Sequence, residues 1–169
     1  MPAQDEVGVP DRGGFGPEVE LFFDDFRPGQ HFELGDHLIS ETEMLAFARQ
    51  FDPQPFHVDP ERASTTIYRG LIASGWHTAA VWMRLYCDHL LLRTASLGSP
   101  GLEELRWLAP VRPGDVLRAS ARVVSARPST RHPERGTLVV KGELRDGAGE
   151  VKMRLTVWGL LARRLPGGD

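Results

Sequence analysis

A long apolar stretch followed by alternating segments most constrains what this chain can fold into. From Gly75 to about Leu92 the residues are apolar on nearly every helical face, which is typical of a buried helix. After it, three segments alternate apolar and polar side chains with a period of two, at residues 117–123, 138–145 and 151–158. That period predicts antiparallel strands with one buried face and one exposed face. We therefore expect a curved antiparallel sheet packed around one long central helix, an α+β fold.

Two more strands and a capped helix are predicted around this framework. Residues 29–39 and 102–108 predict the remaining strands, about five in all, and the second is followed by a turn at 112–115. Ser40 and Glu43 match the capping box, in which the serine accepts from the first turn and the glutamate reaches back to the cap. The sequence therefore predicts a helix that begins just after Ser40.

This helix must end at Phe51 or Asp52, because Pro53 pushes its predecessor out of the helical region. Asp59 followed by Pro60 predicts another helix start, with the aspartate as the N-cap. We prefer that role for Asp59 to a role as a third catalytic carboxylate.

The chain predicts a single domain with a short arm. Residues 1–20 are rich in glycine and proline and have few large apolar groups, so we expect a poorly ordered N-terminal arm. Residues 21–165 are long enough to bury one core. A single open sheet leaves an edge strand exposed, and pairing of two copies would cover it. We therefore expect a homodimer or a higher oligomer built from dimers.

Composition excludes several classes of partner and compartment. A net charge of −3 argues against nucleic acid as a general partner, because binding phosphates needs a concentrated positive face. The single cysteine, Cys87, cannot form an intramolecular disulfide and fits a reducing compartment. The sequence has no run of 18 apolar residues, and its acidic N-terminus is unlike a signal peptide. We expect a cytoplasmic protein with no membrane partner.

One short segment carries chemistry. Asp52 and His57 lie five residues apart in a stretch stiffened by Pro53 and Pro55, and Gly75 opens the central helix downstream. Fully extended, five residues would separate the two side chains by up to about 16 Å. Both can contact one water molecule only if the loop folds back, and two prolines lower the entropy lost in ordering it.

Three segments together resemble the MaoC-like hydratases and dehydratases, hotdog-fold proteins related to (R)-specific enoyl-CoA hydratases. These segments read DPQPFH at 52–57, GLIASG at 70–75 and LRWLAPVRPGD at 105–115, and the resemblance covers roughly residues 24–162. It implies a hotdog fold and the reversible hydration of a 2-enoyl thioester, with coenzyme A or an acyl carrier protein as the carrier. The implied product is an (R)-3-hydroxyacyl thioester, and no cofactor or metal is implied beyond the thioester substrate.

The resemblance also implies roles for individual residues. Asp52 and His57 fall on the catalytic dyad, and Gly75 falls on the residue whose backbone N–H polarises the thioester carbonyl. The implied substrate-binding residues are Gly75, Gln54, Phe56, Ser74 and Trp76. The family usually has asparagine and a small aliphatic residue where this chain has Gln54 and Phe56, and a serine of some hydratases is replaced by Met83. These differences bear on the length and shape of the acyl group.

The residue types support the same chemistry independently. Hydration of a conjugated thioester needs a base for water, an acid for the α carbon and donors for the developing enolate oxygen. The imidazole of His57 exchanges protons near neutral pH, and an ionised Asp52 can hold the water or orient the imidazole. The helix start at Gly75 offers unpaired N–H donors, worth roughly 3 to 4 kcal/mol in a dry site. Glycine there lets a carbonyl approach the backbone closely.

Other functions remain open from the sequence. The same fold commonly hosts thioesterases, which normally centre on one carboxylate, and a non-catalytic acyl-binding subunit of a heteromeric dehydratase is a second alternative. A metal site at Asp52, His57 and Asp59 is disfavoured, because no second histidine lies at ligand spacing. His77 is interpreted as a residue of the core or a substrate contact. Candidates for binding coenzyme A phosphates are Arg49, Arg62, Arg69, Arg84 and Arg106.

Overall fold

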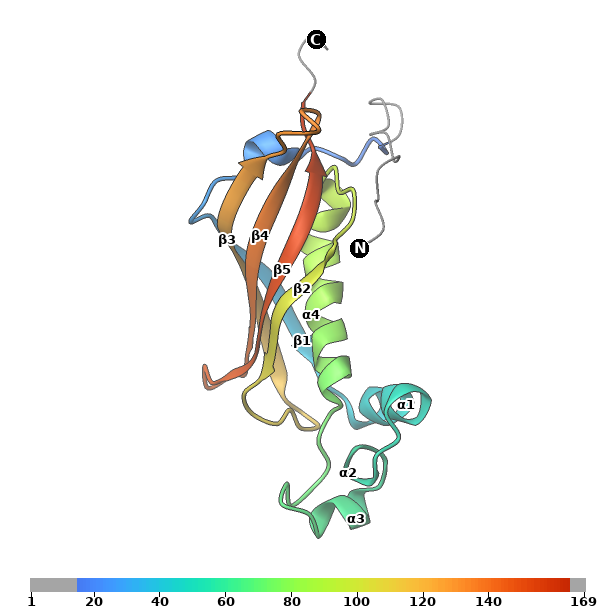
Figure 1. The fold of residues 1–169 in the computed structure, drawn as a ribbon. Coiled ribbons are helices and arrows are strands. Elements are labelled where there is room, and N and C mark those ends of the chain that lie inside the picture. The colour runs from blue at the N-terminus through green and yellow to red at the C-terminus, as the bar shows by residue number, and fades with distance from the viewer. Residues whose placement is uncertain (1–14, 165–169) are drawn as a thin grey trace.

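The computed structural model describes residues 15–164, and they form one curved antiparallel sheet around a central helix, α4 (Gly75–His89) (Figure 1). The sheet has the strand order β1-β3-β4-β5-β2, with all pairs antiparallel. Its strands are β1 (His31–Leu38), β2 (Gly101–Trp107), β3 (Val116–Pro128), β4 (Arg135–Arg145) and β5 (Val151–Ala162). This confirms the α+β arrangement of about five strands predicted from the periodicities.

Trp82 fixes the central helix against the sheet. Its side chain is fully buried, and its indole N–H donates to the Ser120 carbonyl of β3 at 3.1 Å. A Cβ on Gly142 of β4 would overlap the same indole, so the ring packs against the sheet only because residue 142 is a glycine. On β3 the predicted alternation holds, because Leu117, Ala119, Ala121 and Val123 are all buried.

The outer face of β5 departs from simple alternation. The period-two alternation predicts that Lys152 is exposed, yet it is buried. Its amine lies 3.1 Å from Asp146 and 2.5 Å from Glu150. The amine tolerates burial because two carboxylates from the adjoining turn pair with it.

Three short helices gather near the N-terminal end of α4 (Figure 1). They are α1 (Glu41–Phe51), α2 (Pro55–Val58) and α3 (Pro60–Ser64). Ser40 caps α1 as predicted, accepting from the Glu43 N–H at 3.2 Å. The second half of the capping box is wrong, because the Glu43 carboxylate contacts His37 of β1 at 2.9 Å instead. The end of β1 places His37 within reach of this carboxylate.

Two 3-10 helices complete the elements of the described residues. The 3-10 helices η2 (Phe23–Asp25) and η3 (Leu91–Arg93) flank the sheet and the end of α4. Most of the predicted N-terminal arm lies outside the described residues; within its described part, Glu20 forms an ion pair with Arg93 at 2.7 Å. No helix in residues 15–164 is both long and apolar enough to cross a membrane.

Candidate functional site

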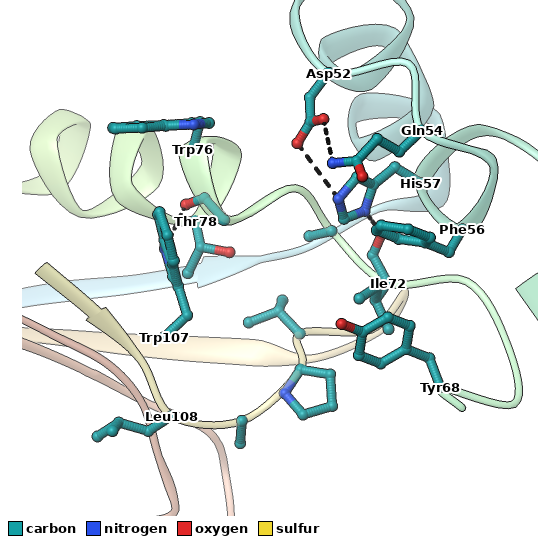
Figure 2. Close-up of a pocket in the computed structure, with 15 residues that line it drawn as sticks. Asp52, Gln54, Phe56, His57, Tyr68, Ile72, Trp76, Thr78, Trp107 and Leu108 are labelled. Carbon is teal, nitrogen blue, oxygen red and sulfur yellow. Dashed lines mark hydrogen bonds and ion pairs between the residues drawn. The ribbon is translucent and has the colours of Figure 1, made fainter. Parts of the chain in front are cut away.

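The loop after α1 brings Asp52 and His57 together. Asp52 is the C-cap of α1, and Pro55 occupies the first turn of α2, so that the chain reverses within five residues. The reversal is held by two backbone bonds of 2.8 Å, from the Gln54 N–H to the Asp52 carbonyl and from the His57 N–H to the Gln54 carbonyl. Asp52 Oδ2 then lies 3.4 Å from His57 Nε2 (Figure 2).

The imidazole of His57 is buried and held in one orientation. Its Nδ1 lies 2.9 Å from the carbonyl oxygen of Ile72. Because a carbonyl oxygen only accepts, Nδ1 carries the hydrogen and donates it. In the neutral ring Nε2 therefore presents a lone pair towards Asp52 and the neighbouring pocket.

Both oxygens of the Asp52 carboxylate accept hydrogen bonds. The Ser74 hydroxyl donates to Oδ2 at 2.7 Å, and the Gln54 side-chain amide donates to Oδ1 at 2.8 Å. Burial raises the pKa of Asp52, but the bonds from Ser74 and Gln54 and the nearby charge of His57 outweigh it and lower the pKa below its ordinary value. Asp52 is therefore held as a carboxylate.

The start of α4 faces the same site. Ser74 is its N-cap and accepts from the Trp76 N–H at 3.2 Å. No acceptor in residues 15–164 takes the Gly75 N–H, which remains one of the unpaired donors of the helix terminus. The indole N–H of Trp107 donates to the Gly75 carbonyl at 2.8 Å. A Cβ on Gly75 would lie 2.5 Å from the Trp107 ring, so glycine is required here by its contact with the indole.

These groups line a pocket of about 480 Å³. Asp52, Gln54 and His57 lie on one side, and Trp76, Thr78 and Trp107 lie across from them (Figure 2). The predicted site residues on its wall are Asp52, Gln54, Phe56, His57, Gly75 and Trp76. The remaining one, Ser74, is fully buried behind the wall.

A second pocket, of about 520 Å³, lies next to the first and is almost entirely apolar. It runs between α4 and the strands β2 and β5, with Met83, Leu155 and Val157 among its lining residues. Trp76 lines both pockets, so the polar site and the apolar one adjoin at this residue.

Several other sequence candidates lie away from this site. Asp59 is the N-cap of α3, accepting from the Arg62 N–H at 3.0 Å. His77 is buried against α1, where its ring stacks on Phe47 at 5.0 Å between centroids. No group of three histidine, cysteine, aspartate or glutamate side chains within residues 15–164 is arranged to hold a metal ion. Two of the candidate arginines have acidic partners, Arg84 with Asp88 at 2.7 Å and Arg106 with Glu104 at 3.3 Å.

Sequence reasoning gave no role to three residues that shape the site. Ile72 acts through its backbone carbonyl, which leaves no mark on the residue type. Trp107 belongs to the 105–115 segment, and a tryptophan close to a turn was the signal available for it. Arg112 supports the loop before α4, donating to the Tyr68 carbonyl at 2.6 Å and the Leu71 carbonyl at 3.4 Å. Tyr68 itself lines the pocket.

The chain is similar in sequence to one protein family and to individual proteins related to it. The family model described as "MaoC like domain" matches residues 25–143. The uncharacterized protein YdeM of Bacillus subtilis is 32% identical over 117 residues, which cover 69% of this chain and 82% of YdeM. An (R)-specific enoyl-CoA hydratase of Rhodospirillum rubrum is 28% identical over 139 residues, covering 72% of this chain and 88% of the relative.

Solved structures agree with the family match. A crystal structure of a MaoC-like dehydratase from Rhodospirillum rubrum has a TM-score of 0.78 and 37% sequence identity, and the match covers 86% of this chain and 99% of that one. A solved structure of a monoamine oxidase regulatory protein from Archaeoglobus has a TM-score of 0.79 and 25% identity, covering 86% of this chain and 96% of that one. These likenesses confirm the hotdog fold.

Proposed function

The chain belongs to the family of MaoC-like domains, and we propose that it catalyses the reversible hydration of a 2-enoyl thioester to an (R)-3-hydroxyacyl thioester. One observation carries this proposal: the Asp52 carboxylate, the His57 imidazole and Gly75, whose N–H is unpaired, all line one pocket. Relatives named as enoyl-CoA hydratase and 3-hydroxyacyl-thioester dehydratase support the same reaction class.

The orientation of His57 favours a particular arrangement of the water. Asp52 Oδ2 and His57 Nε2 both accept hydrogen bonds, so a water molecule between them donates one hydrogen to each and directs its lone pairs into the pocket. Asp52 is the weaker base because Ser74 and Gln54 stabilise its ionised form. His57 therefore takes the proton, and Asp52 stabilises the imidazolium that results.

Hydration then proceeds by addition of the water oxygen to C3 and protonation of C2. The water oxygen bonds to C3 of the enoyl group while His57 Nε2 takes one of its protons. The electrons of the C2=C3 double bond shift to the thioester oxygen, which accepts from the Gly75 N–H. When His57 returns the proton to C2, the electrons move back and the thioester carbonyl re-forms. Dehydration is the reverse of these steps.

The substrate is proposed to be a coenzyme A thioester whose acyl group occupies the second pocket. That pocket is apolar and adjoins the polar one at Trp76, as a hydrocarbon chain beyond C3 requires. Phe56 and Trp76 line the first pocket and are proposed to contact the substrate. A series of 2-enoyl-CoA substrates of increasing length measures the preference, by loss of the conjugated double bond.

The functional unit is proposed to be a homodimer. β2 is an edge strand, and Leu102 and Trp107 on it are 51% and 46% exposed. Pairing with a second copy would bury these side chains and complete the hydrogen bonding of the strand edge.

Substitution of the dyad tests the reaction. Asp52→Asn and His57→Gln are each expected to lower kcat/KM on crotonyl-CoA by about 100-fold or more, because the first removes the charge that stabilises the imidazolium and the second removes the group that takes the proton. Circular dichroism verifies that the variants are folded. Folded variants that keep most of the activity contradict the mechanism.

Release of free thiol, detected with a thiol reagent, would instead identify a thioesterase. Tight binding of acyl-CoA without turnover would identify a binding subunit.

A further inference from the structure

Ser74 connects the start of α4 to the carboxylate of Asp52. Its side chain is 1% exposed and lines neither pocket. Its hydroxyl donates to Asp52 Oδ2 at 2.7 Å and accepts from the Trp76 N–H at 3.2 Å. A hydroxyl has one donor position and two acceptor positions, so both bonds form together. Their directions are fixed, because an amide N–H only donates and an ionised carboxylate only accepts.

The same short segment anchors both members of the dyad. The carbonyl of Ile72 holds the His57 imidazole at 2.9 Å, and the hydroxyl of Ser74 holds Asp52, two residues further along. Gly75, which lines the pocket at the start of α4, comes next in the chain. Four consecutive residues, 72–75, therefore set the positions of the carboxylate, the imidazole and the helix donor relative to one another.

We propose that Ser74 is a positioning residue whose hydroxyl keeps the Asp52 carboxylate directed at His57 and tied to the first turn of α4. The inference rests on the proposed role of Asp52 in hydration. It gives Ser74 a function different from the substrate contact expected from the sequence, because the side chain is buried behind the pocket wall.

Loss of the hydroxyl has two physical consequences. Asp52 Oδ2, the oxygen that faces His57, loses its direct hydrogen bond, so the carboxylate can rotate away from the imidazole. Burial already favours the protonated acid, and the bond from Ser74 is the largest of the effects that oppose it. Removing that bond therefore raises the pKa of Asp52.

Three substitutions separate the bond to Asp52 from the helix cap. Ser74→Ala removes both the hydroxyl and the cap, whereas Ser74→Gly removes the hydroxyl but leaves a residue that is nearly as good an N-cap. Ser74→Thr keeps a hydroxyl for both partners. Ser40→Ala is the matched control, because it removes the serine N-cap of α1, which has no bond to Asp52.

Two measurements on the full chain test the proposal. Steady-state kinetics on crotonyl-CoA are expected to show a kcat lower by about 10- to 100-fold for both Ser74→Ala and Ser74→Gly, with KM nearly unchanged. A carbon-13 NMR titration of the Asp52 carboxyl, assigned by its loss in Asp52→Asn, is expected to show a midpoint at higher pH in both variants. Ser74→Thr should restore both properties, and Ser40→Ala should change neither.

The outcomes distinguish this inference from the proposed function. A titration midpoint unchanged in Ser74→Ala and Ser74→Gly overturns the positioning role. So does a fall in kcat that appears in Ser74→Ala but not in Ser74→Gly, since it follows the helix cap. An active Asp52→Asn variant overturns the proposed function itself. The titration needs no turnover, so it reports on the bond between Ser74 and Asp52 whichever way that experiment falls.

Discussion

Gly75 and Trp107 are matched in shape at the point where the substrate carbonyl is proposed to bind. The indole lies over the glycine so closely that a Cβ would come within 2.5 Å of the ring. The same indole fixes the peptide by donating to the Gly75 carbonyl. The tryptophan thus depends on the glycine for space, and the helix start depends on the tryptophan for orientation.

Gly75→Ala is expected to destabilise the protein by about 1 to 3 kcal/mol, because the added methyl overlaps a packed ring. Urea denaturation measures the change in the free energy of unfolding. Activity on crotonyl-CoA should fall by about 10-fold or more, since relief of the overlap moves the helix start that holds the carbonyl. Gly147→Ala is the matched control, because its Cβ would meet no heavy atom within 4 Å.

A second background tests whether the contact is the cause. Trp107→Leu removes the ring, so Gly75→Ala should destabilise this variant much less than it destabilises the wild type, an interaction energy on the order of 1 kcal/mol. Equal losses in the two backgrounds would show that Trp107 is not the reason for glycine at this position.

At the scale of helices and strands, local signals predicted the fold well. The central helix was predicted at 75–92, and α4 spans Gly75–His89 before η3 takes over. The strands follow the period-two segments because burial on one face is itself a local pattern. The short helix α2 was not predicted, since four residues are too few for a helical period to show.

The site was only partly predictable because its supports act over long separations. The residue types and spacing of Asp52 and His57 were visible in the sequence. Their anchors were not, since Ser74 is 22 residues from Asp52, and Ile72, 15 residues from His57, acts through a backbone carbonyl. The side chain of Glu43 was misplaced for a related reason: its partner, His37, comes from a strand rather than from its own helix.

His77 joins α4 to α1 and makes this junction sensitive to pH. It is buried, its Nδ1 has no partner within residues 15–164, and its Nε2 lies 3.7 Å from Glu43 Oε1. Burial lowers the pKa of His77 below 6.5; Glu43 opposes this shift and His37 adds to it. The unfolded chain therefore binds this proton at a higher pH than the folded chain, so the free energy of unfolding falls as the pH drops below about 6.5.

His77→Gln is expected to lose less stability than the wild type between about pH 7.5 and about pH 5.5, because it removes a group that protonates more easily in the unfolded state. Urea denaturation at the two pH values measures the difference. An unchanged slope in His77→Gln would show that the acid sensitivity arises elsewhere.

At the scale of the whole molecule, the sheet is closed on neither side. Within residues 15–164, β2 pairs only with β5, and its outer edge has no partner. The apolar side chains exposed near this edge include Leu102, Trp107 and Trp158. An exposed apolar edge strand favours pairing with another strand, and a second copy supplies a matching edge by symmetry.

Leu102→Arg is expected to shift the protein from a dimer towards the 18.8 kDa monomer, measured by light scattering after size exclusion. A charge placed in a dry interface is costly, and a 100-fold rise in the dimer Kd corresponds to about 2.7 kcal/mol. Ile67→Arg is the control, because Ile67 is 89% exposed in the loop before α4, away from β2.

If Leu102→Arg stays dimeric while Ile67→Arg dissociates, the interface lies near the small helices rather than at the sheet edge. If the wild type is itself a monomer at micromolar concentration, the edge strand is tolerated unpaired and the proposed dimer is wrong.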